Sequence, residues 1–286
     1  MSSPSSLDIS DTTLTTDTGT VRVRVYRPMT QSPARTGLVW VHGGAFVHGD
    51  IDMPEADWVA KEIAASGRAV VSVDYTLCDA SWLMRGEPPA PDSARFPTAT
   101  REVVAAFRWA SGNVPGVNQW YLGGASAGGN LSLGAAQILR DEGGACPYGL
   151  VLIYPVVHAE LPPLSEEIRR HCDALADQTR ILTPDMVSRM SLGHVGDQMG
   201  LHERYAFPGE GDLANLPPVF VLNAEADSLR ASGQRLVADL AAAGGDVMQV
   251  REPGTAHGHL NEPDLPEAAT SMGRILAWMA MHESVH

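Results

Sequence analysis

The chain has 286 residues, of which 44% are hydrophobic and 19% are charged. Its 20 Lys and Arg against 34 Asp and Glu give a formal net charge of -14, which argues against nonspecific nucleic-acid binding because that needs clustered cations. No window approaches the roughly 20 uninterrupted apolar residues of a membrane-spanning helix, so we expect neither nucleic acid nor membrane as a partner.

The compartment and the redox chemistry can be read from the first residues and the cysteines. Residues 1–10 lack the basic start and the apolar run of a secretory signal. Cys78, Cys146 and Cys172 are odd in number and widely spaced, which predicts neither a disulfide framework nor a thiolate zinc site. We therefore expect a cytoplasmic protein without a structural metal.

The first predicted elements are strands. Residues 1–20 form a polar leader, for which a place in a cap is one interpretation. After it, Val21, Val23 and Val25 alternate with polar residues, as in a half-exposed edge strand. Short apolar runs without alternation then suit strands that are buried on both faces. These runs are 38–41, 69–73, 120–122, 150–154 and 219–222.

Helical periodicity fills the segments between these strands. Apolar residues recur three or four positions apart over 56–65, 98–110, 127–140, 229–243 and 266–281. Such alternation predicts a single α/β domain over residues 1–286, with a mostly parallel sheet, helices on both faces, and ligands at the carboxyl ends of the strands.

One long segment interrupts the alternation. Residues 158–212 contain no strand-like run but short amphipathic pieces around 168–175 and 185–192. Because long excursions in compact α/β domains are usually functional, we interpret this segment as a small helical cap over the site. A decorative inserted subdomain is the alternative.

The first chemical motif is Gly124-Ala125-Ser126-Ala127-Gly128, which matches GxSxG. The pattern alone is weak, but here it follows an apolar run and precedes a predicted helix, as in a nucleophile elbow. Ser126 would then stand at the start of a helix, whose N–H groups and dipole favour a developing oxyanion. A Gly-rich turn with a solvated serine is the structural alternative.

The second motif is His42-Gly43-Gly44-Ala45, directly after the buried run 38–41. Glycines here let the backbone approach a ligand and point N–H groups into the cleft, as acyl transfer requires. The motif could by itself be a simple turn. Two motifs in the correct order make coincidence much less frequent.

At this point the sequence resembles the hormone-sensitive-lipase-like branch of the α/β hydrolases, also called bacterial family IV carboxylesterases. The resemblance runs from about Arg22 to Met281. It rests on VHGGAFVHGD at 41–50, VVSVDY at 70–75, GGASAGGN at 123–130, LVLIYPVV at 150–157, LPPVFVLNAEADSLR at 216–230 and PGTAHGH at 253–259.

The resemblance implies a site and a reaction. It implies Ser126 as nucleophile, Asp227 as acid and His257 as base. It also implies an oxyanion hole built from the backbone N–H groups of Gly43, Gly44 and Ala127. The order Ser, Asp, His is that of α/β hydrolases, and such a triad needs no metal or organic cofactor. The resemblance is compatible with a homodimer.

Each triad partner has a neighbour that competes for its role. Glu225 lies two residues before Asp227, and His259 lies two residues after His257, where the family pattern has an aromatic residue. His257 and His259 could also be a metal-ligand pair, but no Cys or carboxylate cluster completes a coordination set.

Departures from the family pattern concern the pocket. Ala45 stands where a third glycine is usual, and 76–80 differ from the common continuation after Asp74-Tyr75. The stretch 82–84 could add a wall to the pocket. Methionines could line an adaptable apolar site or simply fill the core; they are Met53, Met186, Met190 and Met199.

Three functions remain open at this level. The first is a serine carboxylesterase that hydrolyses small to medium acyl esters through an acyl-enzyme. The second is a lactonase or aryl amidase that uses the same triad. The third is a hydrolase-fold binding protein without catalysis, a class in which a triad residue is typically lost, whereas all three candidates are present here.

Overall fold

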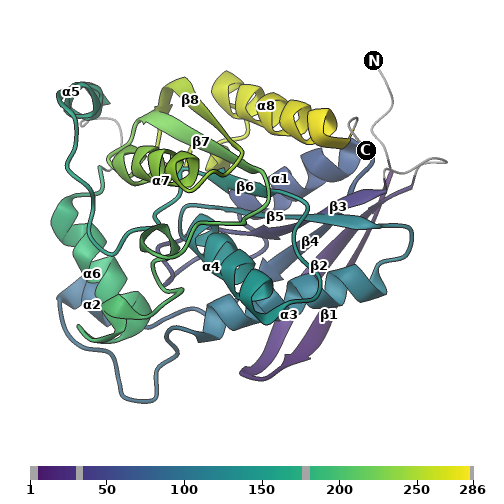
Figure 1. The fold of residues 1–286 in the computed structure, drawn as a ribbon, viewed down its shortest axis with the longest axis horizontal. Coiled ribbons are helices and arrows are strands. Elements are labelled where there is room, and N and C mark those ends of the chain that lie inside the picture. Colours follow the sequence, from purple (N-terminus) through teal and green to yellow (C-terminus); the bar gives the residue numbers. More distant parts are fainter. Residues whose placement is uncertain (1–5, 30–34, 176–180, 284–286) are drawn as a thin grey trace.

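A computed structural model describes residues 6–29, 35–175 and 181–283. It contains one eight-stranded sheet in the order β1-β2-β4-β3-β5-β6-β7-β8 (Figure 1). The strands β1 and β2 are antiparallel to their neighbours, and the six others run parallel. The strands are Leu7–Thr16, Gly19–Pro28, Thr36–Val41, Ala69–Asp74, Gln119–Ala125, Leu150–Ile153, Val219–Ala226 and Val247–Ala256, numbered β1 to β8.

Helices cover both faces of the sheet. On one face, α1 (Pro54–Ala65) and α8 (Pro266–Glu283) pack over the sheet and bury a cluster that includes Trp40, Tyr121 and Trp278. The other face is covered by α3 (Thr98–Asn113), α4 (Ala127–Glu142) and α7 (Arg230–Ala242). The predicted α/β hydrolase architecture, with its mostly parallel sheet between helices, is confirmed.

The N-terminal hairpin differs from the prediction. Residues 7–16 form the edge strand β1 and are not part of a cap, and β2 lies between β1 and β4, so it is not an edge strand. Periodicity could not reveal β1 because only Leu14 in it is buried. Its exposed Thr, Ser and Asp side chains look like a polar leader.

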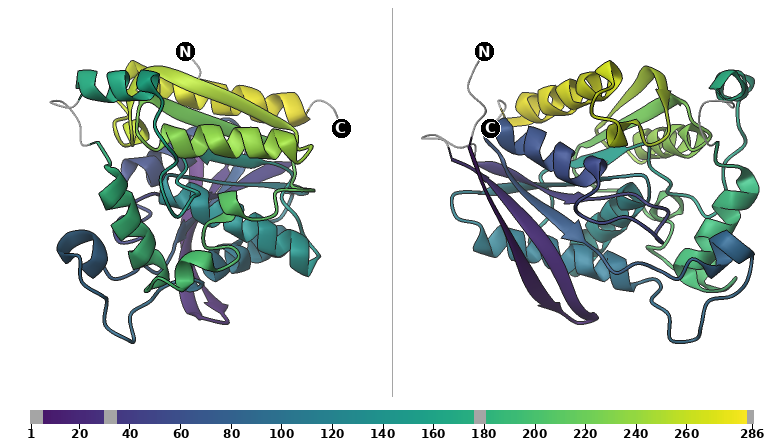
Figure 2. Two further views of the ribbon diagram at one scale, coloured as in Figure 1. Left: turned by 60° about the vertical axis from the view of Figure 1, so that its left-hand side comes forward. Right: turned by 180° about the vertical axis from the view of Figure 1, so that it is seen from behind.

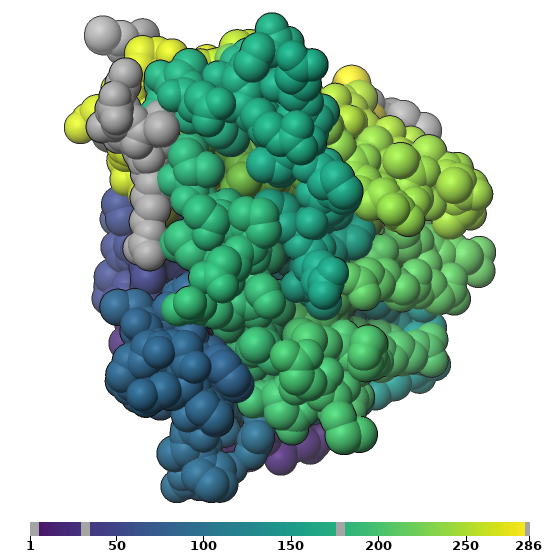
Figure 3. Space-filling view, turned by 90° about the vertical axis from the view of Figure 1, so that its left-hand side faces the viewer, coloured from purple at the N-terminus to yellow at the C-terminus, as the bar shows by residue number. Residues whose placement is uncertain are grey.

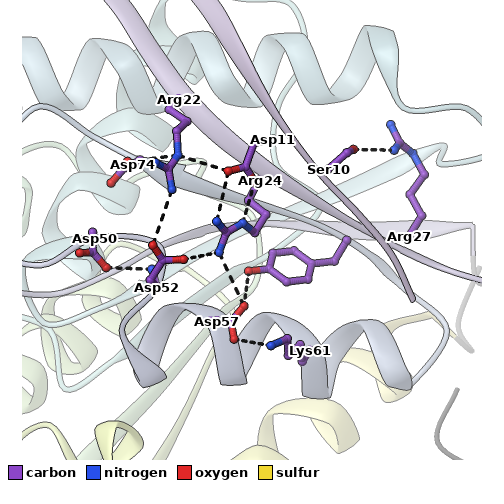
Figure 4. Close-up of polar contacts among 11 residues, drawn as sticks. Ser10, Asp11, Arg22, Arg24, Arg27, Asp50, Asp52, Asp57, Lys61 and Asp74 are labelled. Carbon is purple, nitrogen blue, oxygen red and sulfur yellow. Dashed lines mark hydrogen bonds and ion pairs between the residues drawn. The ribbon is translucent and has the colours of Figure 1, made fainter. Parts of the chain in front are cut away.

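Charged groups attach this hairpin to the segment before α1 (Figure 4). Arg24 on β2 binds the Asp11 carboxylate through Nε and Nη2, at 2.7 and 3.1 Å. Its Nη1 reaches Asp52 Oδ1 at 2.5 Å, and Tyr26 donates to Asp57 Oδ1 at 2.8 Å. One guanidinium therefore connects the edge of the sheet with the loop that follows the His42-Gly43-Gly44-Ala45 motif.

The segment 158–212 lies beyond the carboxyl ends of the strands, on the left of Figure 1. Its elements are α5 (Glu166–Leu175), α6 (Pro184–Val195) and the short 3-10 helices η1 (Gly200–His202) and η2 (Pro208–Glu210). No strand is present in its described residues, as expected. Part of it, 176–180, lies outside the described residues.

A five-residue helix outside this segment lies beside α6 at the same end of the molecule. This helix, α2 (Ser81–Arg85), packs against α6, and Trp82 Nε1 donates to the Gly196 carbonyl at 3.2 Å. The two further views in Figure 2 show the same grouping, and in Figure 3 the green part of the segment 158–212 and the blue residues around α2 adjoin on one face. The helices α2 and α6 thus form a cover from two parts of the chain.

Candidate active site

Ser126 occupies the sharp turn between β5 and α4. Its φ of 54° and ψ of -116° are unfavourable for a residue with a side chain. Close packing enforces this bend, because a Cβ on Gly128 would collide with the carbonyls of Val41 and His42. Ser126 is 6% exposed, so its hydroxyl lies at the start of α4 in a largely dry position.

The ends of three parallel strands bring Ser126, His257 and Asp227 together. Asp227 follows β7 and His257 follows β8. Nε2 of His257 lies 3.0 Å from Ser126 Oγ, and Nδ1 lies 2.7 Å from Asp227 Oδ2. The other oxygen of Asp227 accepts the Leu229 N–H at 2.9 Å, which fixes the carboxylate. The arrangement can transfer the serine proton to an imidazole held by a buried carboxylate.

The competing residues have other partners. Glu225 Oε2 accepts the Gly254 N–H at 2.9 Å. His259 Nε2 lies 2.8 Å from Ser271 Oγ, and burial lowers its pKa to about 4. In the geometry of the described residues, neither takes the place of Asp227 or His257.

The loop after β3 gives a different set of N–H groups from the predicted one. The Gly43 N–H donates to Glu55 Oε1 at 2.7 Å and is therefore unavailable to a substrate, contrary to the prediction for Gly43. Gly44 and Ala45 line the cavity beside Ser126. Within the described ranges, the N–H groups of Gly44, Ala45 and Ala127 have no hydrogen-bond acceptor. The register of the loop could not be read from the motif because it depends on the buried Glu55.

Backbone shape and a buried histidine stabilise this loop. Gly44 has a φ of 112°, and a Cβ there would overlap the His48 carbonyl, so glycine is required. Ala45 and Phe46 also have positive φ, at 53° and 67°. His42 Nδ1 lies 2.7 Å from the Gly43 carbonyl, and burial lowers the pKa of His42 to about 4, which keeps its ring neutral.

A cavity of about 220 Å³ opens above Ser126. Its wall comes from both halves of the cover, with Leu83 on α2 and Met186, Val187 and Met190 on α6. Met53 also lines the cavity, whereas Met199 is 84% exposed and does not. Of the stretch 82–84, therefore, only Leu83 reaches the cavity.

Two residues of the site were not singled out from the sequence. Glu55 is 2% exposed and receives a hydrogen bond from the Tyr154 hydroxyl to its Oε2 at 2.7 Å. The Tyr154 ring lies edge-on to His257, with 4.9 Å between centroids. A signal was present for Glu55, since it shares a helix face with the apolar Val59 and Ile63, four and eight positions later.

Electrostatics adjust the basicity of His257. Burial lowers its pKa, but the nearby Asp227 carboxylate, its hydrogen bond and Glu55 act more strongly together and raise the pKa above its ordinary value. A carboxylate beside an imidazole favours the imidazolium. The surroundings therefore stabilise the cation that forms when His257 accepts a proton.

The fold and this geometry agree with comparisons to known proteins. A family model described as "alpha/beta hydrolase fold" matches residues 38–261. The chain belongs to this family and, as its motifs indicated, to the hormone-sensitive-lipase-like carboxylesterase branch.

Several proteins similar to this chain are named as esterases. Carboxylesterase NlhH of Mycobacterium tuberculosis is 33% identical over 279 residues, which cover 93% of this chain and 79% of that protein. Esterase LipI of the same species is 32% identical and covers 88% and 75%. The structure of an esterase of Pyrobaculum calidifontis superposes with a TM-score of 0.80 at 32% identity, over 97% of this chain and 85% of that one.

Two further observations concern membrane-spanning helices and metal-binding side chains. Among the described residues, no helix combines the length and the apolar character that crossing a membrane would need. The same residues contain no group of three or more His, Cys, Asp or Glu side chains arranged to hold a metal ion.

Proposed function

We propose that the chain is a serine carboxylesterase that hydrolyses small to medium acyl esters through an acyl-enzyme on Ser126. One observation carries this proposal, namely the continuous hydrogen-bonded series from Ser126 through His257 to Asp227. The esterase relatives support it independently.

The reaction follows from the geometry. Ser126 Oγ attacks the ester carbonyl carbon while His257 Nε2 takes the hydroxyl proton, and the carbonyl oxygen becomes an oxyanion. His257 then gives this proton to the leaving alcohol, which leaves an acyl group on Ser126. A water molecule attacks the acyl carbon, His257 accepts one of its protons, and the carboxylic acid departs as the proton returns to Ser126. Asp227 holds the imidazole and stabilises its cation.

Three backbone N–H groups would stabilise the oxyanion. We assign this role to Gly44, Ala45 and Ala127, because their N–H groups are free of protein acceptors within the described chain and they lie next to Ser126. Preorganised N–H donors of this kind are each worth about 3 kcal/mol of transition-state stabilisation.

The cavity supports a preference for small to medium apolar acyl groups. Its volume of about 220 Å³ is below the roughly 300–1,000 Å³ of pockets for drug-sized ligands. Its side chains are mainly aliphatic or Met. Lactones and aryl amides use the same chemistry and are the alternative substrates.

The test is a panel of p-nitrophenyl esters from acetate to decanoate, measured on wild type and Ser126→Ala. We expect the wild type to prefer the shorter chains and Ser126→Ala to lose activity by roughly 10⁴-fold or more. Full activity of Ser126→Ala would overturn the proposed function. Values of kcat/KM for a matched ester, lactone and aryl amide decide between the bonds, and a folded wild type inactive on all three would indicate a binding protein.

A further inference from the structure

Glu55 is a buried carboxylate in the first turn of α1. It is 2% exposed, and among the described residues no Lys or Arg forms an ion pair with it. An isolated buried charge is costly unless hydrogen bonds satisfy it. Its partners therefore indicate what it does.

All the hydrogen-bond partners of the Glu55 carboxylate are donors. Oε1 accepts the Gly43 N–H at 2.7 Å, and Oε2 accepts the Tyr154 hydroxyl at 2.7 Å and Asn261 Nδ2 at 3.2 Å. Burial raises the pKa of Glu55 above its ordinary value, although the bonds from Tyr154 and Gly43 act against this shift. The Gly43 N–H and the Asn261 NH₂ group can only donate, so each oxygen of the carboxylate accepts at least one hydrogen bond, as in the ionised form.

These donors belong to three different parts of the active site. Gly43 immediately precedes Gly44 and Ala45 in the loop after β3. Tyr154 follows β6 and supports the His257 ring edge-on. Asn261 ends η3 (His259–Asn261), four residues after His257, and its Oδ1 also accepts the Glu55 backbone N–H at 3.2 Å.

We propose that Glu55 is a positioning residue whose ionised carboxylate holds the Gly44-Ala45 loop and the His257 loop in register with each other. The inference deepens the proposed function and rests on it. Without Glu55, the donors of Gly43, Tyr154 and Asn261 would lose their common acceptor, and the oxyanion donors would move relative to the imidazole. A misplacement of about 1 Å in such a site costs about 10²-fold in rate.

The charge has a second effect, on the imidazole. The groups that face His257 are Asp227 after β7, Glu55 on α1, Tyr154 after β6 and His259 on η3. Around the cavities beside His257 lie also His48, Glu262 and Glu267. Of these groups, Asp227 and Glu55 raise the pKa of His257. Loss of the Glu55 charge should therefore make His257 less basic.

The main test compares Glu55→Gln with wild type, normalised to the fraction of protein that a fluorophosphonate labels. Glutamine keeps the shape but turns an NH₂ group toward donors. We expect kcat to fall about ten- to a hundred-fold with KM changed less than about threefold. The acid limb of the kcat/KM profile should move to lower pH. Glu55→Asp, which keeps the charge, should lower kcat but leave the acid limb in place.

A matched control is Glu102→Gln. Glu102 is 1% exposed and accepts hydrogen bonds from Thr76 N and Thr76 Oγ1, both at 2.7 Å. It does not line the cavity beside Ser126 and has no hydrogen bond to Gly43, Tyr154 or Asn261. We expect kcat and the acid limb of this variant to stay within about twofold of wild type. This control distinguishes the general effect of neutralising a buried carboxylate from the specific effect of neutralising Glu55.

Tyr154→Phe and Asn261→Ala keep the proposal testable if Glu55→Gln does not fold. Each removes one donor and should lower kcat about three- to tenfold. The double variant Glu55→Gln with Tyr154→Phe should have a kcat within about twofold of that of Glu55→Gln alone. The reason is that the two substitutions remove the same hydrogen bond, so their effects do not add. The proposal is overturned if folded Glu55→Gln retains the wild-type kcat and acid limb, or if Tyr154→Phe and Asn261→Ala both keep full kcat. An inactive wild type would instead refute the proposed function.

Discussion

At the scale of single residues, Ser126 has a strained backbone conformation and His257 lies beside a buried carboxylate. Ser126 keeps a positive φ because Gly128 packs against the backbone after β3, and His257 bonds to both Ser126 and Asp227. The Ser126 turn could be predicted because GxSxG is local in sequence. For Glu55 the sequence held only a weak signal, its place on the apolar face of α1 with Val59 and Ile63. An acid in the first turn of a helix is common, so only the tertiary fold shows which groups Glu55 binds.

The pH dependence belongs to this scale. His257 must be neutral to accept the Ser126 proton, so activity falls as pH decreases through its pKa. Because Asp227 and Glu55 raise that pKa, we expect the midpoint of the acid limb above the ordinary value of about 6.5. The measurement is kcat/KM against pH with an ester that does not ionise. A midpoint below about 6 would contradict the assigned surroundings of His257.

At the scale of elements, the parallel core was predictable and the edges were not. The runs that became β3 to β7 are apolar on both faces, and the helices that cover them are amphipathic, so periodicity identified both. The strand β1 lacks a buried face apart from Leu14, and the five-residue helix α2 is too short for a periodic pattern. Its contact with α6, which completes the wall of the cavity, is long-range.

Acyl selectivity should depend on α6. Met186 on this helix is half-buried and lines the cavity, so Met186→Ala should enlarge the cavity at small cost to folding. We expect the ratio of kcat/KM for hexanoate over acetate to rise by roughly tenfold. The control is Met199→Ala, because Met199 is 84% exposed and should leave the ratio unchanged. Equal ratios in both variants would place acyl binding elsewhere.

At the scale of the whole molecule, the last helix is attached to the middle of the sheet. Glu283, at the end of α8, binds Arg68 Nη2 and Nε at 2.5 and 2.8 Å and accepts the Thr36 hydroxyl at 2.6 Å. The Arg68 side chain is 7% exposed. A contact between residues 215 positions apart cannot be predicted from the sequence pattern. The order of strands and helices, in contrast, could be predicted.

Loss of this connection should reduce global stability. Glu283→Gln leaves the buried Arg68 guanidinium without its charge partner, and we expect unfolding free energy to fall by about 2–4 kcal/mol in urea titrations. Glu87→Gln is the reference, because Glu87 and Arg85 form an exposed pair at 3.4 Å worth at most about 1 kcal/mol. Equal stability of the two variants would show that the α8 connection contributes little.

The central claim is that Ser126, activated by His257 and Asp227, is the nucleophile. The most direct measurement is intact-mass and peptide-mapping spectrometry after treatment of the folded protein with a fluorophosphonate, with Ser126→Ala and Asp227→Asn alongside. We predict one adduct per wild-type chain on Ser126, none on Ser126→Ala, and much slower labelling of Asp227→Asn. A folded wild type without an adduct, or with the adduct on another residue, would contradict the claim.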